Sequence, residues 1–410
     1  MQKDARIPAE PGPEPAVGAI EEAAREPQDV PNPLVLPPPV FLRKLELSGF
    51  RNLEPLSLTL RARLTLIVGE NAQGKTNLLE AVHLATTGTA FRSGRNLELI
   101  RFGVREAVVS GTLELDSGER EVRVQVSDGQ RRAWVDGKGV RGNEGFSRLV
   151  KVVLFTPDDL TLIRGAPSQR RDYLDLAITH LFPRFREITR DYQKVLASRN
   201  RLLQEGASDD LVSVWDARLV ELGSKMIVAR ARFVSRIRDR FQEQFRQVSG
   251  TDLPVSLCYC PDPPELLGYE QEDVRRAFAR ALERRIAEER VRGVTLSGPH
   301  RDELEVKVAG REAAVYASQG QTRMLALSFK LVELHTLLDD QHLVPLFLLD
   351  DVSSELDEAR NRLLMKTLGE AGCQVFVTTT SLRHVPCEGF EGVQVLRVRE
   401  GVVEEEGGGV

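Results

Sequence analysis

The chain lacks several features that mark other classes of protein. Its 410 residues include only four cysteines, Cys258, Cys260, Cys373 and Cys387, and the first two are too close for the paired CxxC arrangement of zinc sites. We therefore expect reduced, unligated thiols, as in cytoplasmic proteins. No apolar run reaches about 18 residues, and no apolar segment follows the amino terminus. The sequence thus predicts neither a membrane helix nor a signal peptide.

Overall positive charge is also missing, because 56 Lys and Arg face 61 Asp and Glu, a formal charge of −5. Two stretches are nevertheless locally basic: residues 164–201 hold nine basic and four acidic residues, and residues 225–246 hold seven and two. Such stretches can bind a phosphate backbone, and the scarcity of interleaved aromatic residues favours duplex over single-stranded DNA. A solvated helix face explains either stretch equally well. The candidate DNA contacts are Arg184, Arg186, Arg190, Lys194, Arg232 and Arg236.

Composition and periodicity divide the chain into five parts. Residues 1–39 are rich in Pro, Glu and Ala, which predicts a disordered extension or a segment added by an upstream start codon. Alternating strands and one helix predict the first part of an α/β core over residues 40–160. A helical insertion is predicted over residues 161–292, and the core resumes over 293–400. Residues 401–410 are expected to form a flexible tail.

A phosphate-binding loop lies between a predicted strand, Leu64–Val68, and a predicted helix from Lys75 to about Thr87. Its backbone N–H groups can line an anion pocket because glycines keep side chains out of it. Lys75 is expected to reach the β- and γ-phosphates of ATP, and the Thr76 hydroxyl to ligate Mg²⁺. The predicted nucleotide-binding residues are Gly69, Glu70, Asn71, Ala72, Gln73, Gly74, Lys75, Thr76 and Asn77.

Two aspartates follow a second apolar strand, predicted over Val344–Leu349. Carboxylates at the carboxyl end of a buried strand lie where ligands bind in open α/β sheets. We expect Asp350 to hold Mg²⁺ together with Thr76. We expect Asp351 to orient and polarise the attacking water, which makes Asp351 and Lys75 the predicted catalytic residues. An aspartate that merely caps a turn is the alternative.

A third segment, Ser318-Gln319-Gly320-Gln321, precedes the acidic strand by about one helix, predicted from Ser318 to about Leu338. Ser318 is a good N-cap, and the free N–H groups of such a helix end suit a γ-phosphate. Helix capping alone is the alternative explanation. Together the three segments supply a phosphate cradle, a Mg²⁺ carboxylate and a second phosphate-binding end, which predicts an ATPase.

The order GENAQGKTN, SQGQTR, LLDD and SELD resembles the ABC-type ATPase heads of the SMC family. Within that class, further segments over nearly all of residues 42–380 are similar to the RecF family: LELSGFRNL, TAFRS, FTPDDL, SQRRDYLD and LSGPHRDEL. The resemblance implies an α/β fold, an SMC-like P-loop ATPase head with a split core, an antiparallel β subdomain and a helical lid or arm.

The resemblance also implies a site shared between two copies of the chain. ATP and Mg²⁺ would lie between the phosphate loop of one copy and a signature segment of the other, in an ATP-dependent homodimer. The residues implied are Ser318, Gly320 and Gln321 as the signature in trans, Ser354 and Asp357 in the loop at the dimer interface, Arg92 near the phosphates, and Thr379 as the γ-phosphate sensor.

RecF-family proteins act in recombinational repair, so the resemblance implies binding to double-stranded DNA near single-strand gaps. It also implies work with RecR and RecO in loading the RecA recombinase, with no membrane partner. Ala72 replaces a usual glycine, a mild change if its φ is negative. Asp351 replaces the longer glutamate of transporter ATPases and a threonine replaces their histidine, so we expect slow hydrolysis.

Three alternatives to this function differ in what they require. A transporter ATPase subunit would need a surface for membrane helices, which the arginine-rich insertion disfavours. A long coiled-coil SMC protein would need hundreds of heptad residues and a CxxC between the two halves of the core, and neither is present. A scaffold that binds ATP without hydrolysing it stays open.

Overall fold

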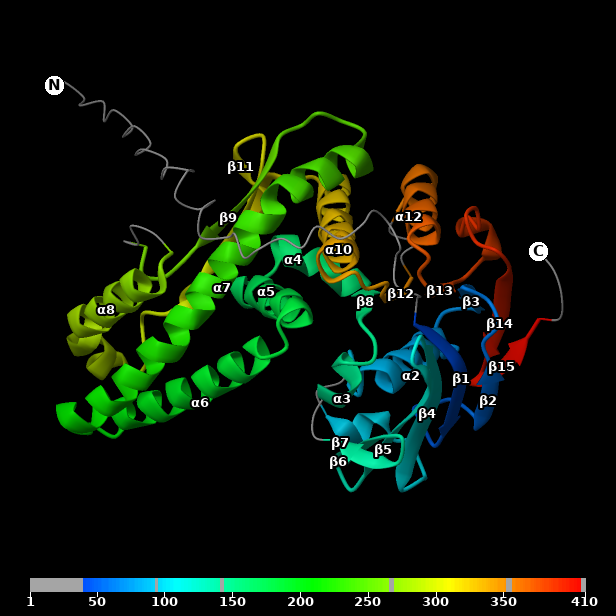
Figure 1. Cartoon of the computed structure of the whole chain (residues 1–410), viewed down its shortest axis with the longest axis horizontal. Coiled ribbons are helices and arrows are strands. Elements are labelled where there is room, and N and C mark those ends of the chain that lie inside the picture. Colours follow the sequence, from blue (N-terminus) through cyan, green and yellow to red (C-terminus); the bar gives the residue numbers. More distant parts are fainter. Residues whose placement is uncertain (1–39, 93–94, 141–143, 265–268, 352–355, 407–410) are drawn as a thin grey trace.

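The computed structural model describes residues 40–92, 95–140, 144–264, 269–351 and 356–406. A core of two large sheets lies at one end, and a helical arm projects from it (Figure 1). The predicted disorder of residues 1–39 and the position of Ser354 lie outside the described residues. Among the described residues, no helix combines the length and apolar character that crossing a membrane requires.

The central sheet carries the two sequence blocks that are far apart in the chain. Its order is β15-β14-β3-β13-β12-β8, and every neighbouring pair is parallel except the antiparallel β14–β15 pair. The carboxyl ends of the parallel strands therefore meet at one edge. The strands are β3 (Leu64–Val68), β8 (Val152–Phe155), β12 (Leu346–Leu349), β13 (Val375–Thr379), β14 (Val393–Arg399) and β15 (Val402–Glu405).

Both faces of this sheet are buried, which explains its almost wholly apolar strands. One face packs on α2 (Lys75–Thr87) and the second sheet. The other packs on α5 (Pro167–Leu181), α10 (Gln319–Gln341) and α12 (Glu358–Glu370). The second sheet is antiparallel throughout, with the order β2-β1-β4-β5-β6-β7. Its strands are β1 (Phe41–Ser48), β2 (Leu56–Thr59), β4 (Glu106–Leu115), β5 (Gly118–Ser127), β6 (Gln130–Val135) and β7 (Lys138–Val140).

The arm consists of three long helices, α6 (Phe185–Gln204), α7 (Asp209–Ser249) and α8 (Gln271–Arg292) (Figure 1). A buried guanidinium ties them together, because Arg199 on α6 pairs with Asp216 on α7 and Glu289 on α8. A three-stranded sheet in the order β11-β10-β9 joins the arm to the core. Its strands are β9 (Val255–Cys260), β10 (Glu303–Val308) and β11 (Arg311–Glu312).

Short helices complete the described structure. They are η1 (Asn96–Leu99), α3 (Glu144–Ser147), η2 (Pro157–Leu160), α4 (Thr161–Arg164), η3 (Pro299–Arg301), α9 (Ala313–Tyr316) and η4 (Leu382–His384).

The carboxyl-terminal residues correct one expectation. The sequence predicts a flexible tail from residue 401, whereas β15 forms a hairpin with β14 and extends the central sheet. Four cross-strand pairs run from Arg399↔Val402 to Leu396↔Glu405, and Arg397 forms an ion pair with Glu406. Backbone pairing with β14 therefore orders this segment, although its run of glutamates suggests a solvent-exposed, flexible chain.

Candidate active site

The phosphate loop is shaped by two glycines at the edge of the central sheet. A Cβ on Gly69 would overlap the carbonyl oxygen of Val398 on the neighbouring strand β14. Gly74 has φ +118 and begins α2, a backbone conformation that side-chain-bearing residues rarely adopt. The loop can therefore bring its N–H groups and the amino end of α2 towards an anion.

Lys75 lies 6% exposed at the start of α2, with its ammonium turned onto the loop. Its Nζ donates to the carbonyls of Gly69, at 2.7 Å, and Glu70, at 2.8 Å. Burial lowers the pKa of Lys75, while Asp351 and Asp350 act in the opposite direction. A buried ammonium held only by neutral carbonyls has much to gain from a phosphate.

The Asp350 carboxylate brings the two sequence blocks together. Its Oδ1 accepts hydrogen bonds from the Thr76 hydroxyl, at 2.9 Å, and the Thr378 hydroxyl, at 2.8 Å. Burial raises the pKa of Asp350, and these hydrogen bonds and Arg92 only partly offset that rise. A buried carboxylate beside a hydroxyl is a set of hard oxygen donors, so the residues fit Mg²⁺.

Asp351 and the phosphate loop enclose a cavity of about 250 Å³. Asp351 has φ +50, and its N–H donates to the Thr378 hydroxyl at 2.8 Å. The cavity is lined by Asn71, Ala72, Gly74, Lys75, Thr76, Asn77, Arg92, Asp351 and Thr378. The structure thus gathers, around one small space, cationic groups for phosphate, oxygen donors for a metal and a carboxylate for water.

The structure places Thr378, rather than the predicted sensor Thr379, at this cavity. Side chains alternate along β13, so the two hydroxyls point to opposite faces. The Thr379 hydroxyl donates to the Ser381 carbonyl at 3.0 Å and accepts from the Ser381 N–H. Sequence alone shows a run of three threonines but not which one faces the ligand.

This difference can be tested with two neighbouring substitutions. Thr378→Val should lower ATP turnover by about tenfold or more, because it removes one hydrogen bond from Asp350 and one from Asp351. Thr379→Val is the matched control and should leave turnover within about twofold of the parent. Steady-state phosphate release measures both. A larger loss of turnover in Thr379→Val than in Thr378→Val would instead support Thr379 as the sensor.

Alanine in place of glycine at position 72 would be a mild change only if the φ of Ala72 were negative, and it is not. Its φ is +64, in the left-handed region, where a Cβ costs about 1 kcal/mol. The loop therefore holds one strained residue beside the cavity it lines.

The β14–β15 turn supports the outer wall of the phosphate loop. Gln73 points away from the cavity, and its carbonyl accepts the Gly401 N–H at 3.0 Å. Its Oε1 accepts the Glu400 N–H at 2.6 Å. Asn52, in the turn after β1, donates to the same Gln73 carbonyl and accepts from Asn77. Sequence reasoning missed Asn52 and Gly401 because both lie outside the phosphate-loop motif.

Gly401 provides a test of this support. It has φ +82, and a Cβ there would overlap the Asn52 carbonyl oxygen. Gly401→Ala should therefore displace the loop and weaken ATP binding by about tenfold or more. Gly392→Ala is the matched control, since Gly392 has the same φ of +82 but open space around the position of its Cβ. Equal ATP affinities in the two variants, measured by equilibrium dialysis, would show that the β14–β15 turn does not hold the phosphate loop in place.

Glu80 is a second residue that sequence reasoning missed. Its fully buried carboxylate lies on α2 and pairs with Arg51 at 2.8 Å. Its other oxygen accepts the backbone N–H of Arg92 at 3.2 Å. Glu80 therefore fixes both flanking segments, the turn after β1 and the TAFRS segment, against α2. An acidic residue inside an apolar helical pattern was the available signal.

The predicted signature residues lie away from this cavity. Ser318 caps α10: its Oγ accepts the Gln321 N–H at 3.1 Å, and the Gln321 side chain accepts the Ser318 N–H at 2.8 Å. Ser318 and Gly320 are exposed and Gln321 is half-buried, and none of the three lines the phosphate-loop cavity. The structure therefore does not bring the signature to the phosphate loop of the same chain.

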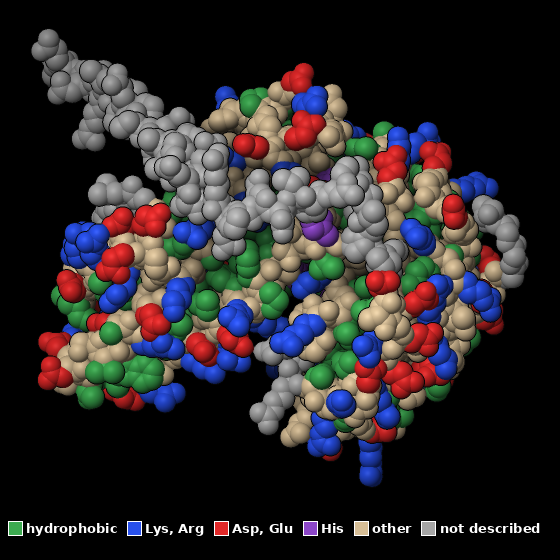
Figure 2. Space-filling model, viewed as in Figure 1, with side chains coloured by type: hydrophobic (Ala, Val, Ile, Leu, Met, Phe, Trp, Pro, Cys, Tyr) green, Lys and Arg blue, Asp and Glu red, His purple; other side chains and the backbone are tan. Residues whose placement is uncertain are grey.

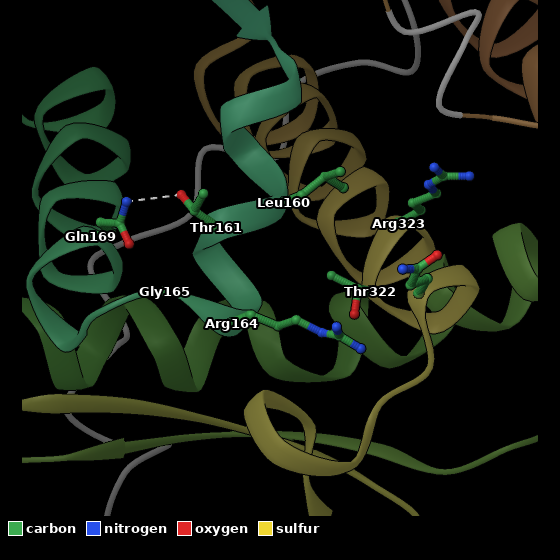
Figure 3. Close-up of a pocket in the computed structure, with 8 residues that line it drawn as sticks. Leu160, Thr161, Arg164, Gly165, Gln169, Thr322 and Arg323 are labelled. Atoms are coloured by element: carbon green, nitrogen blue, oxygen red, sulfur yellow. Dashed lines mark hydrogen bonds between the residues drawn. The ribbon is translucent and has the colours of Figure 1, made fainter.

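A larger cavity of about 420 Å³ lies behind the first turn of α10. Figure 3 shows Arg164 reaching from α4 beside Thr322, with Gln169 bonded to Thr161 on the far side. Arg164 donates to the Ala317 carbonyl at 2.5 Å, immediately before Ser318. This contact connects α4 to the signature segment.

The remaining predicted site residues are placed as follows. Asp357 is the N-cap of α12, and its carboxylate accepts the Arg360 N–H at 3.0 Å and pairs with the Arg360 side chain. Ser354 lies outside the described residues. Arg92 lines the cavity, as described above.

The six basic candidates on the arm are all exposed but differ in their partners. Arg190 and Lys194 pair with Asp191, and Arg236 pairs with Asp340. For Arg184, Arg186 and Arg232, no ion pair forms within the described part of the chain. Arg186 instead lies near Arg131 on β6: burial lowers the pKa of Arg131, and the charge of Arg186 lowers it further.

This fold and site define an ATPase head of the SMC class. The model of the RecF/RecN/SMC N-terminal domain matches residues 41–402. A solved Smc head bound to the C-winged helix domain of ScpA superposes with a TM-score of 0.53 at 18% identity, covering 89% of this chain and 97% of that chain. At that identity the Smc head shows the fold alone.

The closer similarities narrow the class. The DNA replication and repair protein RecF of Geotalea uraniireducens (strain Rf4) is 37% identical over 88% of this chain and 99% of its own length. RecF of Myxococcus xanthus (strain DK1622) is 40% identical over 83% and 90%. A solved structure of the recombination mediator protein RecF-ATPrS in the RecFOR pathway has a TM-score of 0.82 at 30% identity, covering 90% of this chain and 99% of that one. The chain belongs to the RecF family.

Proposed function

We propose that this chain is an ATP-dependent DNA-binding protein of recombinational repair. Two copies close on ATP while bound to duplex DNA near single-strand gaps, and slow hydrolysis releases them. The observation that carries the proposal is the separation of the two half-sites. The phosphate-loop cavity contains the cationic, metal-binding and catalytic groups, whereas Ser318 and Gly320 are exposed elsewhere on the surface.

ATP is the proposed ligand of the phosphate-loop cavity. The solved RecF relatives are described with ATP and with ATPrS, and the cavity's lining supplies what a triphosphate requires. The first-turn N–H groups of α2, Lys75 and Arg92 offer positive charge to the phosphates. Mg²⁺, held by Thr76 and Asp350, would neutralise charge on the β- and γ-phosphates.

Hydrolysis is assigned to groups at the end of β12. Asp351 accepts a hydrogen bond from the attacking water and orients it, while Thr378 fixes the backbone N–H of Asp351. Asp351 is shorter than glutamate by one methylene, and its backbone is held at φ +50. A short carboxylate on a constrained backbone supports slow turnover, suited to timing release rather than to driving a motor.

Dimerisation follows from the exposed end of α10. Its amino-terminal N–H groups carry partial positive charge, and the capping box satisfies only the N–H groups of Ser318 and Gln321. A γ-phosphate held in a second copy would complete this end. ATP would then connect the copies, with Gly320 allowing close approach.

Duplex DNA is the proposed partner of the basic arm. Figure 2 shows Lys and Arg side chains on the arm and on the facing part of the core, mixed with acidic ones. Arg131 on β6 and Arg186 on α6 are close enough for like charges to interact. A DNA phosphate between them would relieve that repulsion.

RecR and RecO are the proposed protein partners, as in the RecFOR pathway of the relatives, and loading of the RecA recombinase is the proposed outcome.

The first test is the solution mass of the Asp351→Asn variant with and without ATP, and with ATP plus a gapped duplex. We expect ATP to shift the mass from 45.8 kDa to twice that value and to tighten binding to the duplex. Ser318→Arg is the control. It should bind ATP but stay monomeric, because the bulky arginine side chain blocks the amino-terminal end of α10.

Either of two results would overturn the proposal. A monomer that binds ATP under all conditions would favour a nucleotide-binding scaffold. Normal dimerisation of Ser318→Arg would contradict the assignment of Ser318 as a contact in trans. DNA stimulation is measured separately, as phosphate release by the unmodified chain with and without the gapped duplex.

A further inference from the structure

A buried ion pair connects α10 to the strand beside the active site. Lys330 lies on α10, three turns after Ser318, with its side chain 7% exposed. Its Nζ pairs with Asp159 Oδ1 at 2.8 Å. The other oxygen of Asp159 accepts the backbone N–H of Thr156 at 2.7 Å and its hydroxyl at 3.3 Å. One carboxylate thus holds both Lys330 and the residue that follows β8.

The strand next to β8 leads into the Mg²⁺ carboxylate, because Asp350 directly follows β12. The Asp350 N–H donates to the Phe155 carbonyl at 2.9 Å, and β8 pairs with β12 in register up to Leu349↔Phe155. A displacement of Asp350 on ligand binding would therefore reach Thr156 through a single backbone step. Strand β8 would carry such a shift because it is only four residues long and is paired with β12 over its whole length.

On its other side, Lys330 is part of a buried cluster that includes residues of α5. Its ammonium lies 5.8 Å from the centre of the Tyr173 ring. Burial alone would lower the pKa of Lys330, but Asp159 and Glu333 raise it above its usual value, so the ammonium is charged. Glu333, one turn further along α10, accepts a hydrogen bond from His180 on α5 at 2.8 Å.

The cluster also lies close to α2. The pKa of His83 is lowered to about 4, mainly by burial and in addition by the nearby charge of His180. His83 packs edge-on against Phe91, with ring centres 5.3 Å apart, in the segment that carries Arg92. A series of neighbouring side chains therefore leads from α2, beside the nucleotide cavity, through His180 on α5 to Glu333 on α10.

We propose that Lys330, held by Asp159, is a positioning residue that sets the orientation of α10, and so of Ser318, according to whether ATP occupies the phosphate loop of the same chain. The inference rests on the proposed function, because it assigns to Ser318 the contact with a second copy. It explains a charge that a purely structural core would not need: an apolar residue at position 330 would pack without requiring a buried counter-ion.

The test variant replaces both partners, Lys330→Met with Asp159→Asn, in the Asp351→Asn background. Methionine fills the space beside Tyr173, and asparagine still accepts from Thr156, so Asp159 does not remain as a charge without Lys330. Glu333 loses the nearby ammonium but keeps its hydrogen bond to His180. We expect ATP affinity within about threefold of the background, but dimerisation that needs about tenfold more protein. Lys330→Arg alone keeps the charge and should dimerise normally.

A matched control comes from a buried ion pair within the arm. Arg199 on α6 pairs with Glu289 on α8 at 2.7 Å, and both side chains are fully buried. Arg199→Met with Glu289→Gln should lower the unfolding temperature at least as much as the test variant does, yet leave dimerisation unchanged. This control separates coupling from simple loss of stability.

A second readout does not depend on dimerisation. In the Ser318→Arg background, ATP should change the hydrogen exchange of the first turns of α10, and the Lys330→Met, Asp159→Asn substitutions should abolish that change. If the chain fails to dimerise at all, the proposed function fails, and the exchange measurement still decides the coupling. A test variant that dimerises like its background, or that keeps the exchange response, would overturn the inference.

Discussion

Lys75→Met should weaken ATP binding by at least about a hundredfold, since two charge-assisted hydrogen bonds to phosphate are each equivalent to about tenfold in affinity. In the structure the Lys75 ammonium is buried and donates to the Gly69 and Glu70 carbonyls and, more weakly, to the Asn71 side-chain oxygen, and burial lowers its pKa. The phosphates of ATP are its natural counter-charge. Equilibrium dialysis with labelled ATP measures the loss directly.

Methionine is the informative replacement because it keeps the length of the side chain. Lys75→Arg serves as the comparison: it keeps the charge but places a wider head group in a cavity of about 250 Å³, so it should bind ATP with intermediate affinity. An unfolding temperature close to that of the unmodified chain would show that the loop still folds. ATP binding by Lys75→Met within about threefold of the parent would mean that the nucleotide lies elsewhere.

The local parts of the fold could be predicted because they depend on short stretches of sequence. Helix α2 runs over Lys75–Thr87 as predicted, since a glycine turn starts it and Gly88, with φ +69, ends it. Strand β3 matches the predicted Leu64–Val68 because four apolar residues and Thr65 form a short run between Arg63 and Gly69. The predicted helix from Ser318 begins one residue later as α10, with Ser318 as its cap.

The rest depended on contacts between distant segments. Whether Thr378 or Thr379 faces the cavity is set by the alternation of β13 within the sheet, and the sequence does not reveal its phase. The left-handed φ of Ala72 belongs to the folded phosphate loop, whose next residue, Gln73, accepts the Gly401 N–H of the β14–β15 turn. That turn is ordered by the pairing of β15 with β14, and the run of glutamates in β15 gives no sign of this pairing in the sequence.

The charged network around α10 could not be predicted for a similar reason. Lys330 and Glu333 lie in an apolar helical stretch, where sequence shows only two charges at a spacing of three. Their partners, Asp159 and His180, are about 170 and 150 residues away in the chain, respectively. Folding brings α5, η2 and α10 together, and only then do the charges acquire a common role.

Asp351→Asn should lower ATP turnover by about a hundredfold or more while leaving ATP affinity within about threefold, because a group that positions and polarises the attacking water contributes chiefly in the transition state. Asparagine is suited to this position, since it tolerates the φ of +50 that Asp351 adopts, and the backbone N–H can still donate to Thr378. Single-turnover hydrolysis, measured beside equilibrium binding, separates the two effects.

Asp351→Glu tests the chemistry from the opposite direction. It restores the missing methylene and keeps the negative charge, so it should retain turnover far above that of Asp351→Asn, although a longer side chain adds strain at a left-handed backbone position. Turnover in Asp351→Asn equal to that of the unmodified chain would exclude Asp351 as the group that orients water. Loss of turnover in both variants together with loss of ATP binding would instead assign Asp351 to holding the loop, because its charge also acts on Lys75.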